Sequence, residues 1–416
     1  MKILLMSIGT RGDCEPFLGV GEMLREYGED VVCAFPEQYR CLAEETGFPF
    51  YSLGTKFISL LNSDAGRTVM GGENGKLQKL TAMAKLSKQS LPIQKDLIDL
   101  QHKIIQKVKP DCIVFHPKVT YPLPWSLKTG GKIVMLSPVP CMIHPVKDRA
   151  TVGINKNLGR LINPLTYKLT NFATASAIMM AVKKYFRGEF TVKRIQQEML
   201  KMKIFYTVSP TIFPRPDYWD DNAIVAGFWE RNKTVHWSPS TELQDFIRGH
   251  KKILFITFGS MVNSDPCGKT KLILEVLREC KIPAILNISG GGLAEPNHYD
   301  KNMVKFISSV PYDWIFPKMY AVIHHGGAGT THSALKAGCA TMAIPHTVDQ
   351  PMWNEMIHAL GVGPKGIPLS KLRKENLKEK IWDLYNQPSY KARAEQIAAQ
   401  IRKEDNTEKL YHFIVH

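Results

Sequence analysis

The chain has 416 residues and a mass of 47.0 kDa, with 44% hydrophobic and 22% charged residues. This length favours two domains over one, and the composition excludes a disordered, collagen-like or coiled-coil protein. The formal net charge of +16 comes mainly from residues 51–203, which hold 25 Lys and Arg against 8 Asp and Glu. A solvated lysine surface, an anionic membrane face and an acidic partner all fit this basic stretch.

The cysteines and the apolar runs of the sequence indicate the cellular compartment of the protein. The eight cysteines contain no pair at two-residue spacing and no dense cluster, so we expect neither a metal knuckle nor a disulfide framework. The apolar run at 3–8 is too short for a signal peptide, and the uncharged run at 169–182 is too short to span a bilayer. We therefore expect a soluble, cytoplasmic enzyme with reduced thiols.

The first half of the chain alternates short apolar runs with helical patterns. The strands expected from the apolar runs are 3–6, 31–35, 111–115, 132–136 and 205–209. The helices expected between them are 17–27, 38–46, 76–109 and the helical stretch 150–205, the last with an apolar face through Phe172, Ile178, Met179, Val182 and Phe186. This β-α rhythm predicts a parallel sheet covered by helices on both faces.

The second half restarts the same rhythm after a proline-interrupted, polar stretch. Strands are expected at 253–258, 284–288, 321–325 and 341–344, and helices at 270–280, 330–337 and within 389–414. We predict an α/β protein with Rossmann-like domains at 1–213 and 247–388, an interdomain linker at 214–246 and a helical tail at 389–416. The two domains are expected to face each other across a central cleft, with the C-terminal helix returning to the first domain.

A glycine-rich turn at residues 324–331, HHGGAGTT, separates a predicted strand from a predicted helix. Glycines let the backbone approach a ligand, and the helix would aim its free N–H groups and positive dipole end at it. This arrangement predicts a phosphate cradle, whereas the alternative is a tight turn that needs glycine only for packing. The Phe258-Gly259-Ser260 turn follows the first strand of the same domain, so both turns could contact one diphosphate.

The absence of several known motifs from the sequence disfavours some classes of reaction. Neither turn has the Gly-Lys-Ser/Thr of a Walker loop or the spacing of a dinucleotide fingerprint, which disfavours ATP hydrolysis and hydride transfer. The chain also contains no Asp-x-Asp pair to bridge a divalent ion and a sugar diphosphate. We expect no metal, with cationic help from the helix end, backbone amides and a protonated His325.

Two motifs carry a resemblance to a known family. Residues 325–331, followed by 345–351 (PHTVDQP), resemble the carboxyl-terminal donor signature of nucleotide-sugar-dependent glycosyltransferases of GT-B fold. The resemblance is strongest to the sterol glucosyltransferase and antibiotic glycosyltransferase branch, including the 24-residue step from His325 to Asp349. Residues 9–16, GTRGDCEP, resemble the opening of that branch's acceptor domain. Together the motifs frame nearly the whole chain.

The resemblance implies a role for individual donor-site residues. The diphosphate would be held by His325, Gly327, Gly329 and Thr330, together with Ser260 from the other turn. Asp349 and Gln350 would bind the hexose hydroxyls, and the backbone around Val310 would meet the base. The ribose-binding glutamate of plant members falls on Ser333 here, and their base-stacking tryptophan has no counterpart, which leaves Trp314 as a structural residue.

Asp13 is the candidate general base, in a position where the resemblance places the branch's proposed base. It follows the first strand, and a carboxylate there could take the proton of an acceptor hydroxyl. The rival interpretation is a cap for a helix beginning at Pro16. His116 ends another strand and would assist or orient Asp13, or would serve only as a structural histidine. Because no second carboxylate motif is visible, we expect inversion at the anomeric carbon.

The sequence therefore predicts an inverting, metal-independent hexosyltransferase without a cofactor. It would move a hexose, with UDP-glucose as the expected co-substrate, to a hydroxyl of a sterol, triterpenoid, polyketide or flavonoid. A nucleotide-sugar epimerase and a non-catalytic nucleotide-sugar-binding protein are the alternatives. The expected partner is a hydrophobic small-molecule or lipid acceptor and not nucleic acid, while peripheral contact of residues 51–203 with an anionic membrane and the oligomeric state stay open.

Overall fold

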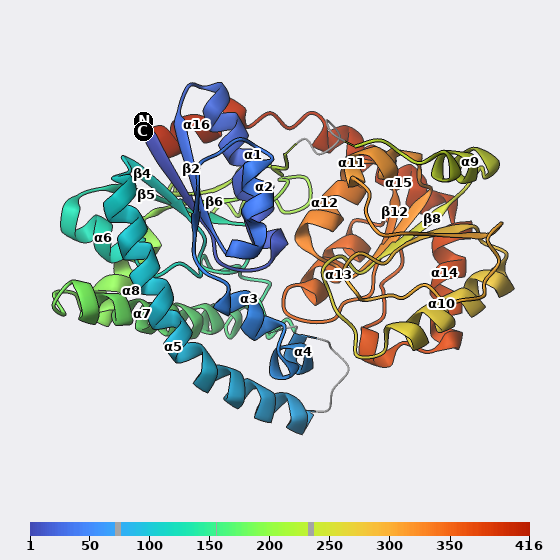
Figure 1. Ribbon diagram of the computed structural model, residues 1–416, viewed down its shortest axis with the longest axis horizontal. Helices are drawn as coiled ribbons and strands as arrows, with labels where there is room; N and C mark the ends of the chain where they lie inside the picture. The colour runs from blue at the N-terminus through green and yellow to red at the C-terminus, as the bar shows by residue number, and fades with distance from the viewer. Residues whose placement is uncertain (71–75, 155, 232–236) are drawn as a thin grey trace. The chain divides into compact units, whose positions relative to one another are not determined.

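The computed structural model describes residues 1–70, 76–154, 156–231 and 237–416 (Figure 1). The chain divides into two compact units. The amino-terminal unit comprises Met1–Ser63, Ala84–Arg231 and Glu404–His416, and the carboxyl-terminal unit comprises Asp64–Met83 and Asn232–Lys403.

A seven-stranded parallel sheet forms the amino-terminal unit. Its strands are β1 (Lys2–Met6), β2 (Asp30–Phe35), β3 (Phe50–Ser52), β4 (Cys112–Phe115), β5 (Lys132–Ser137), β6 (Lys203–Tyr206) and β7 (Ala223–Val225), in the order β3-β2-β1-β4-β5-β6-β7. The helices are α1 (Arg11–Glu26), α2 (Arg40–Glu44), α3 (Lys56–Leu61), α5 (Lys76–Val108), α6 (Pro122–Thr129), α7 (Asn163–Tyr185), α8 (Val192–Lys201) and α16 (Thr407–Val415). The first residues of α5, up to Met83, group with the other unit. Ile3 to Met6 are fully buried because helices cover both faces of β1, which explains its uninterrupted apolar run.

A five-stranded parallel sheet forms the carboxyl-terminal unit. Its strands are β8 (Leu254–Thr257), β9 (Ala284–Asn287), β10 (Val304–Ile307), β11 (Ala321–His324) and β12 (Ala340–Ala343), in the order β10-β9-β8-β11-β12. The helices are α4 (Asp64–Met70), α9 (Thr241–Gly249), α10 (Pro266–Cys280), α11 (Tyr312–Ile315), α12 (Ala328–Lys336), α13 (Gln350–Ala359), α14 (Lys374–Asn386) and α15 (Pro388–Ile401). Leu254 and Ile256 pack into one core and Phe255 into the core on the opposite face, as the alternation of side chains along a strand requires.

Both sheets reverse their strand order at one point. In the first sheet the order reverses between β1 and β4, where Met6 pairs with Phe115. In the second it reverses between β8 and β11, where Thr257 pairs with His324. Open parallel sheets bind ligands outside the carboxyl ends of their strands at such switch points. The predicted α/β class with two parallel-sheet domains is confirmed, and each sheet offers one place for a site.

The boundaries differ from the predicted ones. The predicted linker at 214–246 contains β7, which pairs with β6, and the first residues of α9. Asp64–Met83, predicted within the first domain, groups with the carboxyl-terminal unit. Residues 232–236 of the predicted linker, and residue 155 of a predicted helical stretch, lie outside the described residues. β7 was missed because a three-residue strand is too short to show alternation.

The end of the chain packs on the amino-terminal unit. Figure 1 shows α16 beside α1, and the rings of Tyr27 and Tyr411 stack with their centroids 4.2 Å apart. Leu410 and Ile414 are fully buried in the same core as the residues of β1. Glu404 accepts hydrogen bonds from Ser209 and Thr211, which ties down the start of this segment. The last helix is therefore an integral part of the amino-terminal unit.

The apolar face predicted for the helical stretch after residue 150 is only partly right. Ile178, Val182 and Phe186 are buried, but Phe172 is exposed because it lies on another side of α7 from the buried positions 171, 175, 178 and 182. Among the described residues, no helix combines the length and the apolar character needed to cross a membrane.

Removing the buried side chain of α16 should destabilise the amino-terminal unit. Leu410→Ala leaves a cavity in the core and should lower the free energy of unfolding by about 2 to 5 kcal/mol. The matched control is Lys409→Ala, because Lys409 is an exposed neighbour on the same helix. Urea denaturation followed by circular dichroism would measure both. Equal stability of the two variants would contradict the packing of α16.

Candidate functional site

The switch point of the amino-terminal sheet brings Asp13 and His116 together. The amide of His116 donates to the carbonyl of Met6 over 2.9 Å, which places the residue after β4 beside the end of β1. Gly9 has φ +148°, and a Cβ atom there would lie 2.1 Å from Oδ2 of Asp13. Glycine at this position therefore gives the carboxylate room to fold back over the strand end.

Asp13 caps α1 from inside the helix. The helix begins at Arg11 and not at Pro16 as expected, so Asp13 occupies its first turn. Its Oδ2 accepts hydrogen bonds from the amide of Thr10 over 2.7 Å and from the hydroxyl of Thr10 over 3.1 Å. One carboxylate oxygen thus caps the helix, while the second oxygen faces His116.

His116 is buried and holds one defined proton. Its Nδ1 accepts a hydrogen bond from the amide of Lys118 over 3.1 Å, so the neutral ring carries its proton on Nε2. Nε2 lies 3.1 Å from Oδ1 of Asp13, although the N–H direction departs from a linear hydrogen bond. Burial lowers the pKa of His116 and outweighs the opposing charge of Asp13, so the ring is neutral at physiological pH.

Lys118 is a partner of Asp13 that the sequence reasoning missed. Its Nζ lies 3.1 Å from Oδ2 of Asp13, whose side chain is only 15% exposed. Burial raises the pKa of Asp13, but the charge of Lys118, with smaller contributions from His116 and Thr10, holds that pKa well below its usual range. The signal was present in the sequence as a lysine two residues beyond His116, at the same strand end.

In the carboxyl-terminal unit, two glycine turns enclose the ring of His325. Gly259, after β8, has φ +57°, and a Cβ atom there would lie 2.6 Å from Cε1 of His325. A Cβ atom on Gly327 would lie 2.3 Å from Nε2 of the same ring. Both turns therefore need glycine for the imidazole to fit, and Ser260 stands exposed beside them.

The imidazole of His325 has an unused polar atom. Its Nδ1 has no hydrogen-bond partner within the described part of the chain, although the residue is only 8% exposed. Burial, and then the neighbouring His324 and His346, hold its pKa well below the usual value. The expectation of a protonated His325 is wrong for the free protein, because a buried cation here would lack any compensating charge.

The amino terminus of α12 lies directly after this ring. The first backbone hydrogen bond of the helix runs from the Thr331 amide to the Gly327 carbonyl over 3.0 Å. The amides of Ala328, Gly329 and Thr330 consequently have no acceptor within the helix. A Cβ atom on Gly329 would meet open space, so these amides border room for a ligand. Free amides and the positive end of a helix together favour a phosphate group.

The loop before α13 holds the two predicted sugar ligands differently. Oδ2 of Asp349 accepts a hydrogen bond from the indole of Trp353 over 2.8 Å, which fixes the carboxylate. Gln350 is buried, and its Oε1 accepts from the amides of His346 and Thr347 over 2.7 and 3.1 Å. In this arrangement Gln350 shapes the loop, and Asp349 is the better placed to meet a sugar hydroxyl.

The remaining predicted positions are structural in their side chains. Val310 is buried in the core with Phe255 and Phe316, so only its backbone could meet a base. The hydroxyl of Ser333, at the position of the family's glutamate, donates to the Gly329 carbonyl over 3.0 Å. The ring of Trp314 packs on that of Trp237, with centroids 4.9 Å apart.

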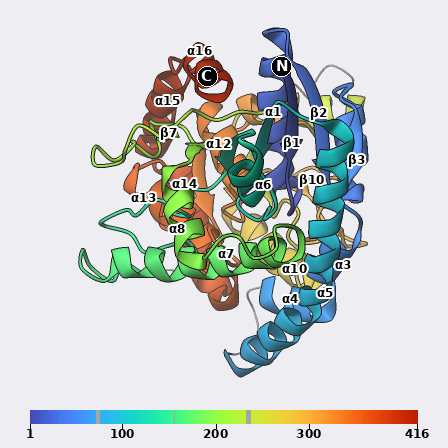
Figure 2. The same cartoon turned by 90° about the vertical axis from the view of Figure 1, so that its left-hand side faces the viewer.

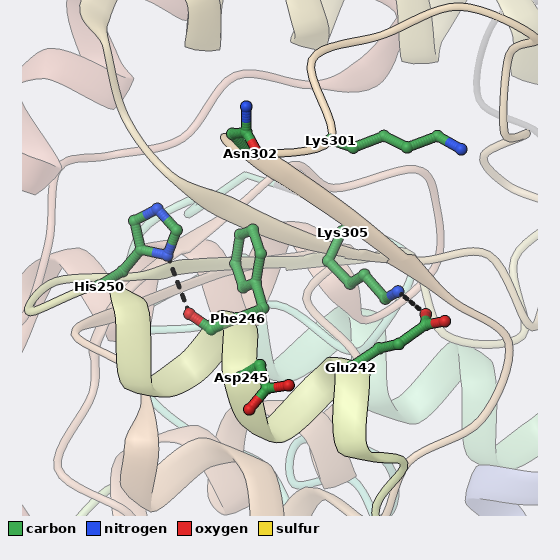
Figure 3. Close-up of a pocket in the computed structure, with 7 residues that line it drawn as sticks. All are labelled: Glu242, Asp245, Phe246, His250, Lys301, Asn302 and Lys305. Atoms are coloured by element: carbon green, nitrogen blue, oxygen red, sulfur yellow. Dashed lines mark hydrogen bonds and ion pairs between the residues drawn. The ribbon is translucent and has the colours of Figure 1, made fainter.

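A pocket on the carboxyl-terminal unit lies away from these turns. Its lining comes from α9 and the region around β10: Glu242, Asp245, Phe246, His250, Lys301, Asn302 and Lys305 (Figure 3). Lys305 stands near the amino end of β10, whereas the donor turns follow the carboxyl ends of parallel strands. Within the described ranges, no group of three or more His, Cys, Asp and Glu side chains could hold a metal ion.

Comparison with known proteins agrees with this arrangement. Residues 284–409 match the family described as the C-terminal domain of erythromycin biosynthesis protein CIII-like proteins. The solved glycotransferase of kitacinnamycin is similar with a TM-score of 0.72 at 15% identity, covering 99% of this chain and 98% of that one. The fold is GT-B. A second GT-B structure, the Streptomyces glycosyltransferase SsfS6 complexed with thymidine diphosphate, covers 100% of this chain and 99% of its own, with a TM-score of 0.63 and 14% identity.

Sequence similarity points to the same branch. The chain is 28% identical over 97% of its length to a sterol 3-beta-glucosyltransferase of Arabidopsis thaliana. It spans 64% of the length of that relative. The resemblance to the sterol and antibiotic branch of GT-B glycosyltransferases, predicted from the motifs, is confirmed.

Replacing Lys118 by Met should weaken the protein mainly near neutral pH. The change removes the cation beside Asp13, so the pKa of Asp13 should rise toward its ordinary value. A carboxyl with a lowered pKa stabilises the fold above its unfolded pKa of about 3.9, and this contribution is lost as the pH falls through the folded pKa. The difference in unfolding free energy between parent and variant should therefore shrink in acid.

Urea denaturation over a series of pH values would measure this difference. Lys128→Met is the matched control, because Lys128 pairs with Glu189 at a more exposed site, where ion pairs contribute little. The same pH-dependent loss in both variants would show that Lys118 has no special influence on Asp13.

Proposed function

We propose that the protein is a nucleotide-sugar-dependent glycosyltransferase that moves glucose from UDP-glucose to the hydroxyl of a sterol. The observation that carries the donor half is the buried, unpartnered Nδ1 of His325 beside the free amides of α12. A buried polar atom without a partner is costly and is expected where a ligand completes the hydrogen bond. The likeness to sterol glucosyltransferases supports the acceptor half.

In this proposal the carboxyl-terminal unit binds the donor through hydrogen bonds alone. The diphosphate would accept from the amides of Gly329 and Thr330 and from the hydroxyl of Ser260. Gly259 and Gly327 would keep the ring of His325 in place, and its neutral imidazole would donate one further hydrogen bond. Such preorganised donors stabilise the charge that develops on a leaving group, so the reaction needs no divalent ion.

Asp349 would accept hydrogen bonds from the hexose hydroxyls, held in orientation by Trp353. Gln350 would act indirectly, by fixing the loop that carries Asp349. The base would meet the backbone near Val310. A uridine nucleotide carrying glucose is the proposed donor, which is consistent with a relative named as a glucosyltransferase and with a thymidine diphosphate complex of another relative.

Asp13 of the amino-terminal unit would activate the acceptor. Its carboxylate takes the hydroxyl proton as the acceptor oxygen bonds to the anomeric carbon. The bond from that carbon to the diphosphate breaks, and the nucleotide leaves with the electron pair. One displacement of this kind inverts the anomeric configuration, so an α-linked donor gives a β-linked product. The Nε2–H of His116 would hold Asp13 in position throughout.

The pairing with Lys118 bears on this step. A carboxylate with a lowered pKa is a weak base, so the bound acceptor must compete with Lys118 for Oδ2 of Asp13. Lys118 is 43% exposed and has a long, flexible side chain, so it would move away from Asp13 when an acceptor binds. Withdrawal would raise the basicity of Asp13 only when an acceptor is present. We place the reaction in the cytoplasm, where UDP-glucose and reduced thiols coexist.

Filling the open space at Gly329 should separate donor binding from folding. Gly329→Ala should leave stability unchanged or slightly raised, since Ala favours a helix by about 1 kcal/mol over Gly. It should nevertheless weaken UDP binding by about tenfold or more, because the methyl group occupies the space beside the phosphate amides. Gly327→Ala is the comparison variant. It should lose both stability and UDP affinity, since its methyl group collides with His325.

Isothermal calorimetry with UDP and thermal unfolding would measure the two properties. Unchanged affinity in the stable Gly329→Ala variant would place the diphosphate elsewhere.

The activity itself is tested by UDP release from UDP-glucose with and without a detergent-dispersed sterol. We expect release only when sterol is present, and a β-linked sterol glucoside by NMR. Asp13→Asn keeps the cap on Thr10 but lacks the base, and turnover should fall by about 10²- to 10⁴-fold while UDP affinity stays the same. Sugar conversion without acceptor would indicate an epimerase, and binding without either reaction would indicate a sensor.

A further inference from the structure

The first half of α7 buries several polar side chains. Asn163, Thr166 and Asn171 are buried there, on the same side of the helix as Tyr167. Each of the three forms a hydrogen bond with the preceding loop. The Asn163 side chain donates to the Lys147 carbonyl over 3.0 Å, the Thr151 amide donates to Thr166 over 3.0 Å, and the Asn171 side chain donates to the Ile143 carbonyl over 3.1 Å. These hydrogen bonds fix the rotation of the helix about its axis.

The opposite side carries a row of large apolar residues. We call it the leucine row, and its members are Leu158, Leu161, Ile162, Leu165, Leu169 and Phe172, all exposed to solvent. Leu161 is 88% exposed and Leu169 is 70% exposed. Within α7, positions 165, 169 and 172 repeat at the spacing of one helical face, whereas Leu158, Leu161 and Ile162 lie in the segment just before the helix. Figure 2 shows α7 as one continuous helix. Apolar patches of this kind on a protein surface mark an interaction site.

The charges around the leucine row indicate which kind of partner it binds. Residues 149–188 contain seven Lys and Arg and no Asp or Glu. Lys156, Arg160 and Lys168 are exposed next to the row. Two copies of this face would bring like charges together, and an apolar protein partner would leave the cations unmatched. An anionic lipid surface matches both features, because lysines pair with headgroups while leucines enter the acyl boundary.

We propose that the leucine row docks the amino-terminal unit on an anionic membrane, with the start of α7 lying in the interface plane. The helix does not need to cross the bilayer for this. A sterol acceptor resides in such a membrane, so docking would bring the unit that carries Asp13 to its substrate. This purpose rests on the proposed function, whereas the docking itself does not.

The test is flotation of the full chain with lipid vesicles. One set is phosphatidylcholine alone, and the other is an equal mixture of phosphatidylcholine and phosphatidylserine. The variant carries Leu161→Gln, Leu165→Gln and Leu169→Gln, since Gln keeps helical propensity and the three positions are exposed. The matched control is Trp382→Gln, an exposed apolar residue on α14 of the carboxyl-terminal unit.

The parent and the control should float with the mixed vesicles more than with the neutral ones, and the triple variant should bind the mixed vesicles at least about tenfold more weakly. Equal unfolding midpoints for all three proteins would show that folding is intact. Undiminished binding of the triple variant, or no binding of the parent, would overturn the proposal. So would a parent dimer in sedimentation that the triple variant dissociates, which would make the row a contact between copies.

This experiment contains neither donor nor acceptor, so its outcome is independent of the glycosyl transfer. With detergent-dispersed sterol the triple variant should retain the parent's turnover. With sterol embedded in the mixed vesicles its turnover should fall in parallel with its binding. Failure of the transfer reaction with intact vesicle binding would refute the proposed function and leave the docking surface standing.

Discussion

The fit of the His325 ring between Gly259 and Gly327 is the constraint on which the proposed donor site depends. A methyl group on either glycine would overlap the ring, so the ring fits only because both turns carry glycine. The parallel pairing of β8 and β11 makes this meeting inevitable, because it sets the ends of both strands at the same edge. The backbone amides at the amino terminus of α12 border the space beside this ring, and the helix alone fixes their positions.

The two switch points solve opposite electrostatic problems. At the donor edge the ring of His325 stays neutral, so positive potential comes from backbone amides that cannot lose a proton. At the other edge Asp13 keeps its charge in a nearly closed setting because Thr10, His116 and Lys118 surround it. The positive potential of backbone amides does not change with pH, which suits a ligand that is always anionic. A carboxylate whose cationic partner can leave suits a step in which a proton must be taken.

The sequence predicted what depends on periodicity and spacing. Strand ends and glycine turns identified Asp13, His116 and His325 as edge residues, because parallel strands bring such positions together whatever the packing. It did not predict Lys118 as the partner of Asp13, or the internal role of Gln350, since both depend on which way a side chain turns after its strand. The grouping of Asp64–Met83 with the second unit was missed because contacts distant in sequence define it.

The leucine row is a further feature that the periodicity of the sequence could not predict alone. Periodicity reveals that a helix has two faces, but it is the hydrogen bonds of Asn163, Thr166 and Asn171 that decide which face is turned inward. Exposing leucines forgoes the burial that stabilises most helices, so the arrangement costs stability unless something covers them. These hydrogen bonds favour the observed rotation of α7, although Oδ1 of Asn171 has no hydrogen-bond partner within the described residues. The same rotation leaves the leucines exposed, as the proposed lipid contact requires.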